Sequence, residues 1–161
     1  MATPQRAIFN GMGQNQWYVH LSRTDGADLG VIKSALGDLR AACAAEDINL
    51  TLGIGPGLLP DLTDDVPDDF QTYVTVESDD GSGRQAKGTQ EELLLWLNHD
   101  DKDKVWKAQY DTRTALEGHM AVARETPTFI YGDSLDMTGF KDGTGNPADE
   151  DQPAAAIVPD G

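Results

Sequence analysis

A glycine-dense loop at residues 139–147, Gly-Phe-Lys-Asp-Gly-Thr-Gly-Asn-Pro, places a single carboxylate, Asp142, in the middle of permissive backbone. Glycine lets a chain take positive φ or approach a flat ligand closely, and the proline at 147 stops a regular element from continuing. Such a loop can hold one acid in a fixed place, as acid–base chemistry requires. Asp-Gly and Asn-Pro are also ordinary turn dipeptides. Composition alone therefore leaves both a chemical loop and a plain surface turn open.

Other chemical sites are not supported by the sequence. His20, His99 and His119 show no metal-ligand spacing, so we expect ordinary structural or solvated histidines and no metal site. The loop does not fit a calcium-binding EF-hand, because Pro147 stands where that pattern needs glycine and Pro153 where it needs glutamate. The sequence also contains no nucleophile-elbow motif of a serine hydrolase.

The composition limits the possible partners. The chain has 161 residues, enough for one domain with a real core, and its 28 acidic against 12 basic residues give a formal charge of -16. That charge repels nucleic acid and anionic membranes, so we expect neither as a partner. Residues 1–10 lack the pattern of a signal peptide, and the single cysteine, Cys43, allows no intrachain disulfide. These features favour a cytoplasmic protein.

Two strand-helix-strand units can be read from hydrophobic periodicity. In the first, alternation predicts strands at 17–22 and 48–54, and Asp28 is placed to cap the helix between them. Cys43 continues the apolar stripe of that helix and is therefore predicted to lie in the core. The stripe comprises Leu29, Ile32, Leu36, Leu39 and Cys43.

The glycines at 53–57 do not form a dinucleotide fingerprint, because a Leu-Leu-Pro sequence follows them instead of a helix. Residues 61–89 are rich in Asp, Gly and Pro and are predicted to form a long excursion with one short alternating piece at 73–76. Thr89 and Glu92 fit a helix-capping box, yet the apolar run at 93–97 could equally be a buried strand.

The second helix is predicted to begin at Asp101 or Asp103 and to end at Gly118, and a strand at 121–125 follows it. Its inward residues should be Val105, Ala108, Thr112 and Leu116. If 93–97 is a strand, the fold class is α+β: a ferredoxin-like antiparallel sheet with two helices on one face. We expect the other face to be unusually apolar, because neighbouring positions at 17–21 all carry large side chains.

The Gly-x-x-Asp-Gly spacing of residues 139–143, followed by Thr-x-Asn-Pro and preceded by Asp-Met-Thr at 136–138, resembles the signature of the dye-decolourising (DyP-type) haem peroxidases. Segments 52–55 and 93–97 also fall where that family places similar segments, and this favours a strand at 93–97. The resemblance runs from about residue 16 to 161. It implies the N-terminal half of an enzyme built from two related ferredoxin-like halves, with residues 1–132 as one such domain and 133–161 as the haem loop and connector.

The resemblance also implies a function. The family binds haem b, reduces hydrogen peroxide, oxidises small dye-like or phenolic reducing substrates, and commonly forms homo-oligomers. Asp142 would be the distal acid–base residue. The haem-binding residues implied by the resemblance are Gly139, Phe140, Asp142, Gly143, Thr144 and Asn146.

The chain departs from the family pattern at two positions: Gly145 stands where a glutamate is common, and Ile130 where an arginine is frequent. The family's proximal histidine and distal arginine lie in the second half, and no histidine of this chain matches the former. An alternative is a non-catalytic ferredoxin-like module that binds a ligand or dimerises through its sheet and uses 139–147 as a turn.

Overall fold

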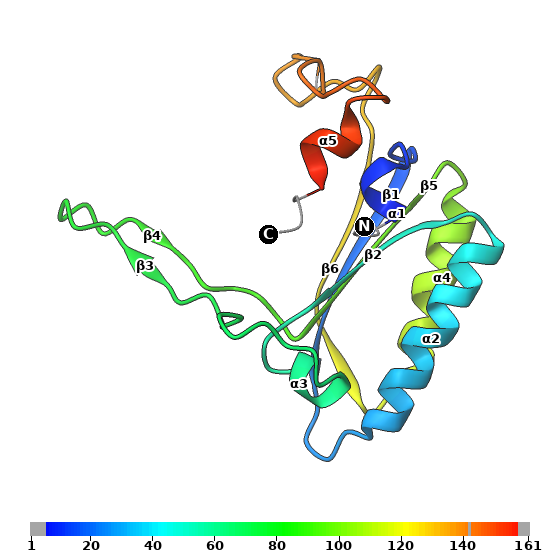
Figure 1. Ribbon diagram of the computed structural model, residues 1–161, viewed down its shortest axis with the longest axis vertical. Coiled ribbons are helices and arrows are strands. Elements are labelled where there is room, and N and C mark those ends of the chain that lie inside the picture. The colour runs from blue at the N-terminus through cyan, green and yellow to red at the C-terminus, as the bar shows by residue number, and fades with distance from the viewer. Residues whose placement is uncertain (1–5, 142, 158–161) are drawn as a thin grey trace.

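The computed structural model describes residues 6–141 and 143–157. Its centre is a four-stranded antiparallel sheet in the order β2-β5-β1-β6. The strands are β1 (Asn15–Arg23), β2 (Asn49–Ile54), β5 (Leu93–His99) and β6 (Met120–Phe129). Helices α2 (Leu29–Ala45) and α4 (Lys102–Ala115) both lie on one face of the sheet (Figure 1). The predicted ferredoxin-like α+β fold is confirmed.

Both long helices begin where the sequence predicts. The Asp28 carboxylate accepts hydrogen bonds from the backbone N–H groups of Gly30, at 2.7 Å, and Val31, at 3.3 Å. Asp101, and not Asp103, caps α4 by accepting from the Asp103 N–H at 2.9 Å. Each bond satisfies a donor that the helix itself leaves unpaired. Helix α4 ends at Ala115, three residues before Gly118, whose positive φ of 80° then redirects the chain into β6.

The apolar run that periodicity left ambiguous is a strand. β5 pairs with both β1 and β2, so it occupies an inner position of the sheet and has neighbours on two sides. Leu93, Leu95 and Leu97 are fully buried against the helices. The capping-box reading at Thr89 and Glu92 is therefore wrong: pairing with two strands outweighs the local helix signal.

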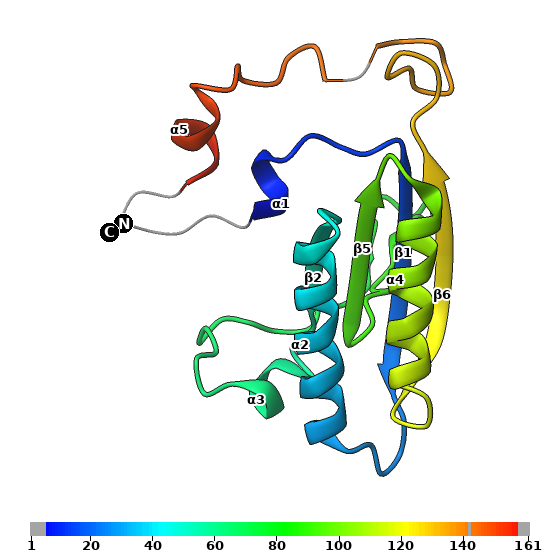
Figure 2. The same ribbon diagram turned by 90° about the vertical axis from the view of Figure 1, so that its right-hand side faces the viewer.

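One continuous core lies between the sheet and the two helices. Val19 and Leu21 of β1 meet the predicted stripe of α2, including Cys43, which is buried as expected. Helix α4 contributes Val105 and Ala108 to the same core. Each fully buried aliphatic side chain stabilises the fold by about 1.5–3 kcal/mol relative to an exposed one. Figure 2 shows how the two helices run side by side along the sheet.

The opposite face of the sheet, here called the open face, differs from our expectation. Strand alternation directs Trp17, Val19 and Leu21 toward the helices, so the open face receives mainly amide and hydroxyl side chains. At its centre the rings of Tyr18 and Trp96 stack with centroids 5.2 Å apart. The prediction of an unusually apolar face is wrong. The open-face residues of β1, β5 and β2 are Gln16, Tyr18, His20, Ser22, Leu94, Trp96, Asn98, Asn49, Thr51 and Gly53.

The remaining elements are short. The 61–89 excursion projects from the sheet on the side opposite to the helices (Figure 1), and its only paired strands are β3 (Val76–Glu77) and β4 (Gln85–Ala86). Most of the predicted alternating piece at 73–76 is therefore loop. The single-turn helices α1 (Arg6–Phe9), α3 (Leu59–Leu62) and α5 (Gln152–Ala156) were not predicted. Among the described residues, no helix is both long and apolar enough to cross a membrane.

Candidate functional site

The glycine loop belongs to a compact segment that follows β6. The last bond tying the end of β6 to β1 is donated by Ile130 N–H to the Gln14 carbonyl, at 2.9 Å. The chain then folds on itself through two isolated bridges, from Tyr131 to Leu135 and from Leu135 to Lys141. An ion pair between Lys141 and Asp133, at 2.6 Å, closes this double turn. Local contacts, and not the core, therefore hold the segment.

Asp136 organises the first part of the loop. One of its carboxylate oxygens accepts from Thr138 N–H at 2.8 Å, Thr138 O–H at 2.7 Å and Phe140 N–H at 3.0 Å. These bonds, the Thr138 hydroxyl first, hold the pKa of Asp136 below its usual range. The sequence analysis assigned Asp136 only to the segment that precedes the motif. The Asp-x-Thr spacing of a side-chain-capped turn was the signal that could have identified its role.

Two loop glycines have the predicted left-handed backbone. Gly139 has φ of 90° and Gly143 has φ of 79°, values that other residues adopt only with strain. Gly145 does not have positive φ, and an added side chain there would meet no atom within 4 Å. Asn146 N–H donates to the Gly143 carbonyl at 3.1 Å, which closes the second turn.

The loop presents its apolar side chains to the outside. Phe140 is 74% exposed and Met137 is 86% exposed. Thr144 is also exposed, and Asp142 lies outside the described residues. The structure thus places Gly139, Phe140 and Gly143 in one exposed loop. The division predicted between residues 132 and 133 falls inside the double turn and stays a prediction.

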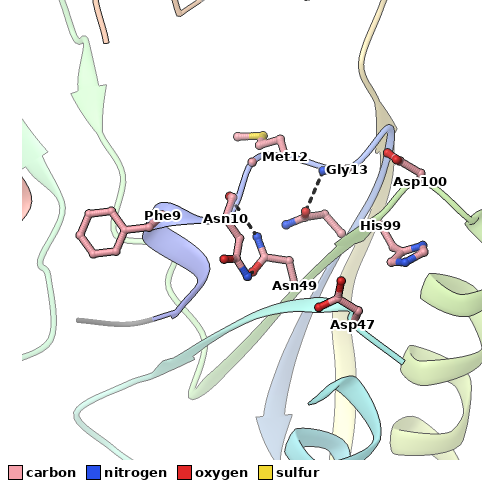
Figure 3. Close-up of a pocket in the computed structure, with 10 residues that line it drawn as sticks. Phe9, Asn10, Met12, Gly13, Asp47, Asn49, His99 and Asp100 are labelled. Atoms are coloured by element: carbon pink, nitrogen blue, oxygen red, sulfur yellow. Dashed lines mark hydrogen bonds between the residues drawn. The ribbon is translucent and has the colours of Figure 1, made fainter. Parts of the chain in front are cut away.

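Asn146 is also exposed, and it faces the N-terminal segment across a groove. It lines a cavity of about 470 Å³ together with Phe9, Trp96 and Gln152, so the chain beyond the loop returns to one end of the open face. A neighbouring pocket of about 650 Å³ lies under the 9–13 segment (Figure 3). There Gly13 N–H donates to the Asn98 side-chain oxygen at 2.9 Å.

The three histidines do not come together. The His99 ring accepts from Asp101 N–H at 2.8 Å, and the His119 ring accepts from Asp28 N–H at 3.0 Å, so both support helix starts. His20 lies on the open face beside Arg124. Within residues 6–141 and 143–157 no cluster of side chains could hold a metal ion.

Comparison with known proteins gives a result at the level of structure. No family model and no curated protein matches the sequence. A dye-decolorizing protein from V. cholerae superposes with a TM-score of 0.82 at 22% identity, over 98% of this chain and 54% of its own. DyPB from Rhodococcus jostii RHA1 superposes with a TM-score of 0.76 at 25% identity, over 94% of this chain and 50% of its own.

This chain has the fold of the N-terminal half of a DyP-type peroxidase. It spans about half the length of these DyP-type structures. A putative DyP-type peroxidase from Shewanella oneidensis superposes with a TM-score of 0.76 at 20% identity, over 92% of this chain and 50% of its own. Two R. jostii DypB variants among the similar structures are in complex with heme. At these identities the DyP-type fold is shared, while the chemistry of the 139–147 loop has to be argued separately.

Proposed function

We propose that this chain is the N-terminal portion of a haem-dependent peroxidase that reduces hydrogen peroxide and oxidises dye-like or phenolic donors. The observation that supports it most is the shared fold over 98% of the chain with a dye-decolorizing protein, combined with the Gly-x-x-Asp-Gly loop at 139–143. A cytoplasmic location and assembly into a homo-oligomer stay predictions.

The loop has features that suit one face of haem b. Gly139 and Gly143 turn the backbone without side chains, and Phe140 and Met137 offer exposed apolar surface to a flat macrocycle. When bound, haem b supplies the iron at which peroxide is activated. His99 and His119 each use a ring nitrogen to hold a helix start, and His20 lies beside Arg124 in a pocket that no described residue of the loop lines. We therefore assign the iron ligand to a residue outside this chain.

Asp142 is the acid–base residue of the proposal. Splitting the O–O bond heterolytically requires a proton to move from one peroxide oxygen to the leaving one, and a carboxylate at fixed position can relay it. Gly139 and Gly143, which flank residues 140–142 in the sequence, both have positive φ. The bonds of Asp136 fix the approach to that turn.

The test replaces Asp142 in the haem-loaded, full-length protein. Asp142→Asn keeps the size of the side chain but removes the proton relay, and general acid–base catalysis typically contributes about 10² to 10⁴ in rate. We expect haem binding to persist, while the peroxide-dependent absorbance change in stopped-flow spectroscopy slows by about that factor.

Asp149→Asn is the matched control, because Asp149 is an exposed carboxylate beyond the motif, and it accepts a hydrogen bond from the Gln152 side chain. Its rate should equal that of the parent protein. A rate for Asp142→Asn within about threefold of the parent, far below an acid–base contribution, would remove Asp142 from the mechanism.

The module alternative is favoured by one observation: both long helices lie on the other face of the sheet, so neither covers the open face. Its amides and hydroxyls surround a single aromatic pair, so the face lacks the apolar surface that a sheet-to-sheet dimer would bury. We therefore place this alternative second. Haem binding by the full-length protein, with the spectrum of a histidine-ligated iron, separates the two proposals.

A further inference from the structure

A second pocket lies on the open face, away from the glycine loop. One residue from each strand of the sheet stands in a single row across its floor: Gly53, Leu94, His20 and Arg124, in the strand order β2-β5-β1-β6. Both limbs of the 61–89 excursion form its wall, and the volume of this open pocket is about 490 Å³. No described residue of the 139–147 loop lines it.

The floor of this pocket, here called the Arg124 pocket, is shaped by a glycine and a bulge. A Cβ atom at position 53 would lie 3.3 Å from Leu94 Cβ. The glycine therefore leaves space in the pocket next to Leu94. The register between β1 and β6 shifts at this level, where His20 pairs with Arg124 and Leu21 pairs with Val122. The extra residue in β6 forms a β-bulge. Such bulges often change the direction of a side chain next to an active or binding site.

The wall combines two aromatic side chains with polar ones. Phe70 and Tyr73 come from the first limb of the excursion and Lys87 from the second. The second limb is held to the first by the Gln90 side chain, which donates to the Tyr73 carbonyl at 3.0 Å. A cavity of this size, mostly apolar with a few polar groups, has the dimensions of a small-molecule site.

The charge in the Arg124 pocket is unusual for this chain. Its lining carries two cations, Lys87 and Arg124, against one carboxylate, Glu91, although the whole chain has a net charge of -16. Within the described residues neither cation has a carboxylate at ion-pair distance. Glu91 is engaged by the Ser22 hydroxyl, which donates to it.

Among the described residues, the polar side-chain contact of the Arg124 guanidinium is with an imidazole. The guanidinium lies 3.3 Å and 3.4 Å from the two ring nitrogens of His20. Burial and the adjacent Arg124 lower the pKa of His20, while Glu91 opposes them. The lowered pKa of His20 favours the neutral ring, which adds no negative charge next to Arg124.

We propose that the Arg124 pocket binds a small aromatic carboxylate. The planar guanidinium of Arg124 matches a carboxylate with two parallel hydrogen bonds, and Lys87 adds a second positive charge. The aromatic ring of the ligand lies over Leu94 and Gly53, between Phe70 and Tyr73. The proposal is independent of haem and of the loop at 139–147.

The test is a titration of the ¹⁵N-labelled 161-residue chain with 2-naphthoate, followed by amide and histidine resonances. Naphthalene-2-methanol, which has the ring but no charge, is the matched probe. We expect saturable shifts at residues of the Arg124 pocket, with half-saturation at or below about 1 mM for a ligand of this size. The pKa of His20 should rise on binding, because a carboxylate nearby favours the protonated ring.

Variants assign the binding to its residues. Arg124→Gln should weaken 2-naphthoate at least about tenfold, the size of a lost charge-assisted pair, and Lys87→Gln should weaken it less. Naphthalene-2-methanol should be insensitive to both substitutions. Arg40→Gln is the control, because Arg40 is an exposed arginine of α2, on the other face of the sheet.

Three outcomes overturn the proposal. The first is the absence of saturable shifts, and the second is equal affinity of the acid and the alcohol. The third is unchanged affinity in Arg124→Gln with a native amide spectrum. A loss of haem binding or peroxidase activity in the full-length protein bears only on the proposed function.

Discussion

The two faces of one sheet differ in what holds them and in what they can do. The face under α2 and α4 carries Val19, Leu21 and Leu95, all buried in the continuous core. The open face carries amides, hydroxyls, the Tyr18–Trp96 pair and the Arg124 pocket. Neighbouring residues of the same strand therefore have opposite roles. Stability is concentrated on one side, and groups able to recognise a ligand are concentrated on the other.

The largest expected effect on stability comes from comparing two adjacent leucines of β5. Leu95→Ala removes a fully buried side chain under the helices and should lower the free energy of unfolding by about 2–5 kcal/mol. Leu94→Ala, on the half-buried open face, should cost about 1 kcal/mol, because it removes less buried area and leaves no closed cavity. Urea denaturation of both variants measures the two values. Equal losses would mean that the open face contributes to stability as much as the core does.

A smaller effect is expected at the start of α2, which covers the core. Asp28→Ala leaves two backbone donors unpaired and should lower the free energy of unfolding by about 1 kcal/mol. Asp25→Ala is the control, since the Asp25 carboxylate is exposed and does not cap the helix. The comparison uses thermal or urea unfolding at one pH. A loss as large in Asp25→Ala would show that general charge effects, and not the cap, set the stability.

The smallest effect concerns the glycine loop, which is held by local bonds. The pKa of Asp136 is lowered from 3.8, so its bonds are complete above that pH and are lost as pH falls through the lower, folded value. The amide resonances of Thr138 and Phe140 should therefore titrate below pH 3.8, while the core resonances stay unchanged.

Two substitutions check that assignment. Asp136→Asn should abolish the titration of Thr138 and Phe140, because an amide does not ionise in this range. Asp133→Asn removes another low-pKa carboxylate of this segment, which pairs with Lys141, and should leave that titration in place. Titration of the core at the same pH would show that the loop and the sheet unfold together.

The sequence by itself determined the local elements. The caps at Asp28 and Asp101, the stripe of α2 and the alternation of β1 are set within a few residues, since each depends on side chains one turn or one pleat apart. The positive φ of Gly139 and Gly143 was likewise predictable, because only glycine adopts it without strain. The role proposed for Asp142 rests on resemblance, and that residue lies outside the described part of the chain.

Only the tertiary structure decided the long-range contacts. Residues 93–97 became a strand because β1 and β2 pair on both of its sides, and no local rule contains that information. The open face is largely polar because strand alternation directs both aliphatic residues of β1, Val19 and Leu21, toward the helices. His20 and Arg124 meet across a bulge although they are 104 residues apart. Hydrogen bonding between strands sets such neighbours, and the order of residues along the chain does not.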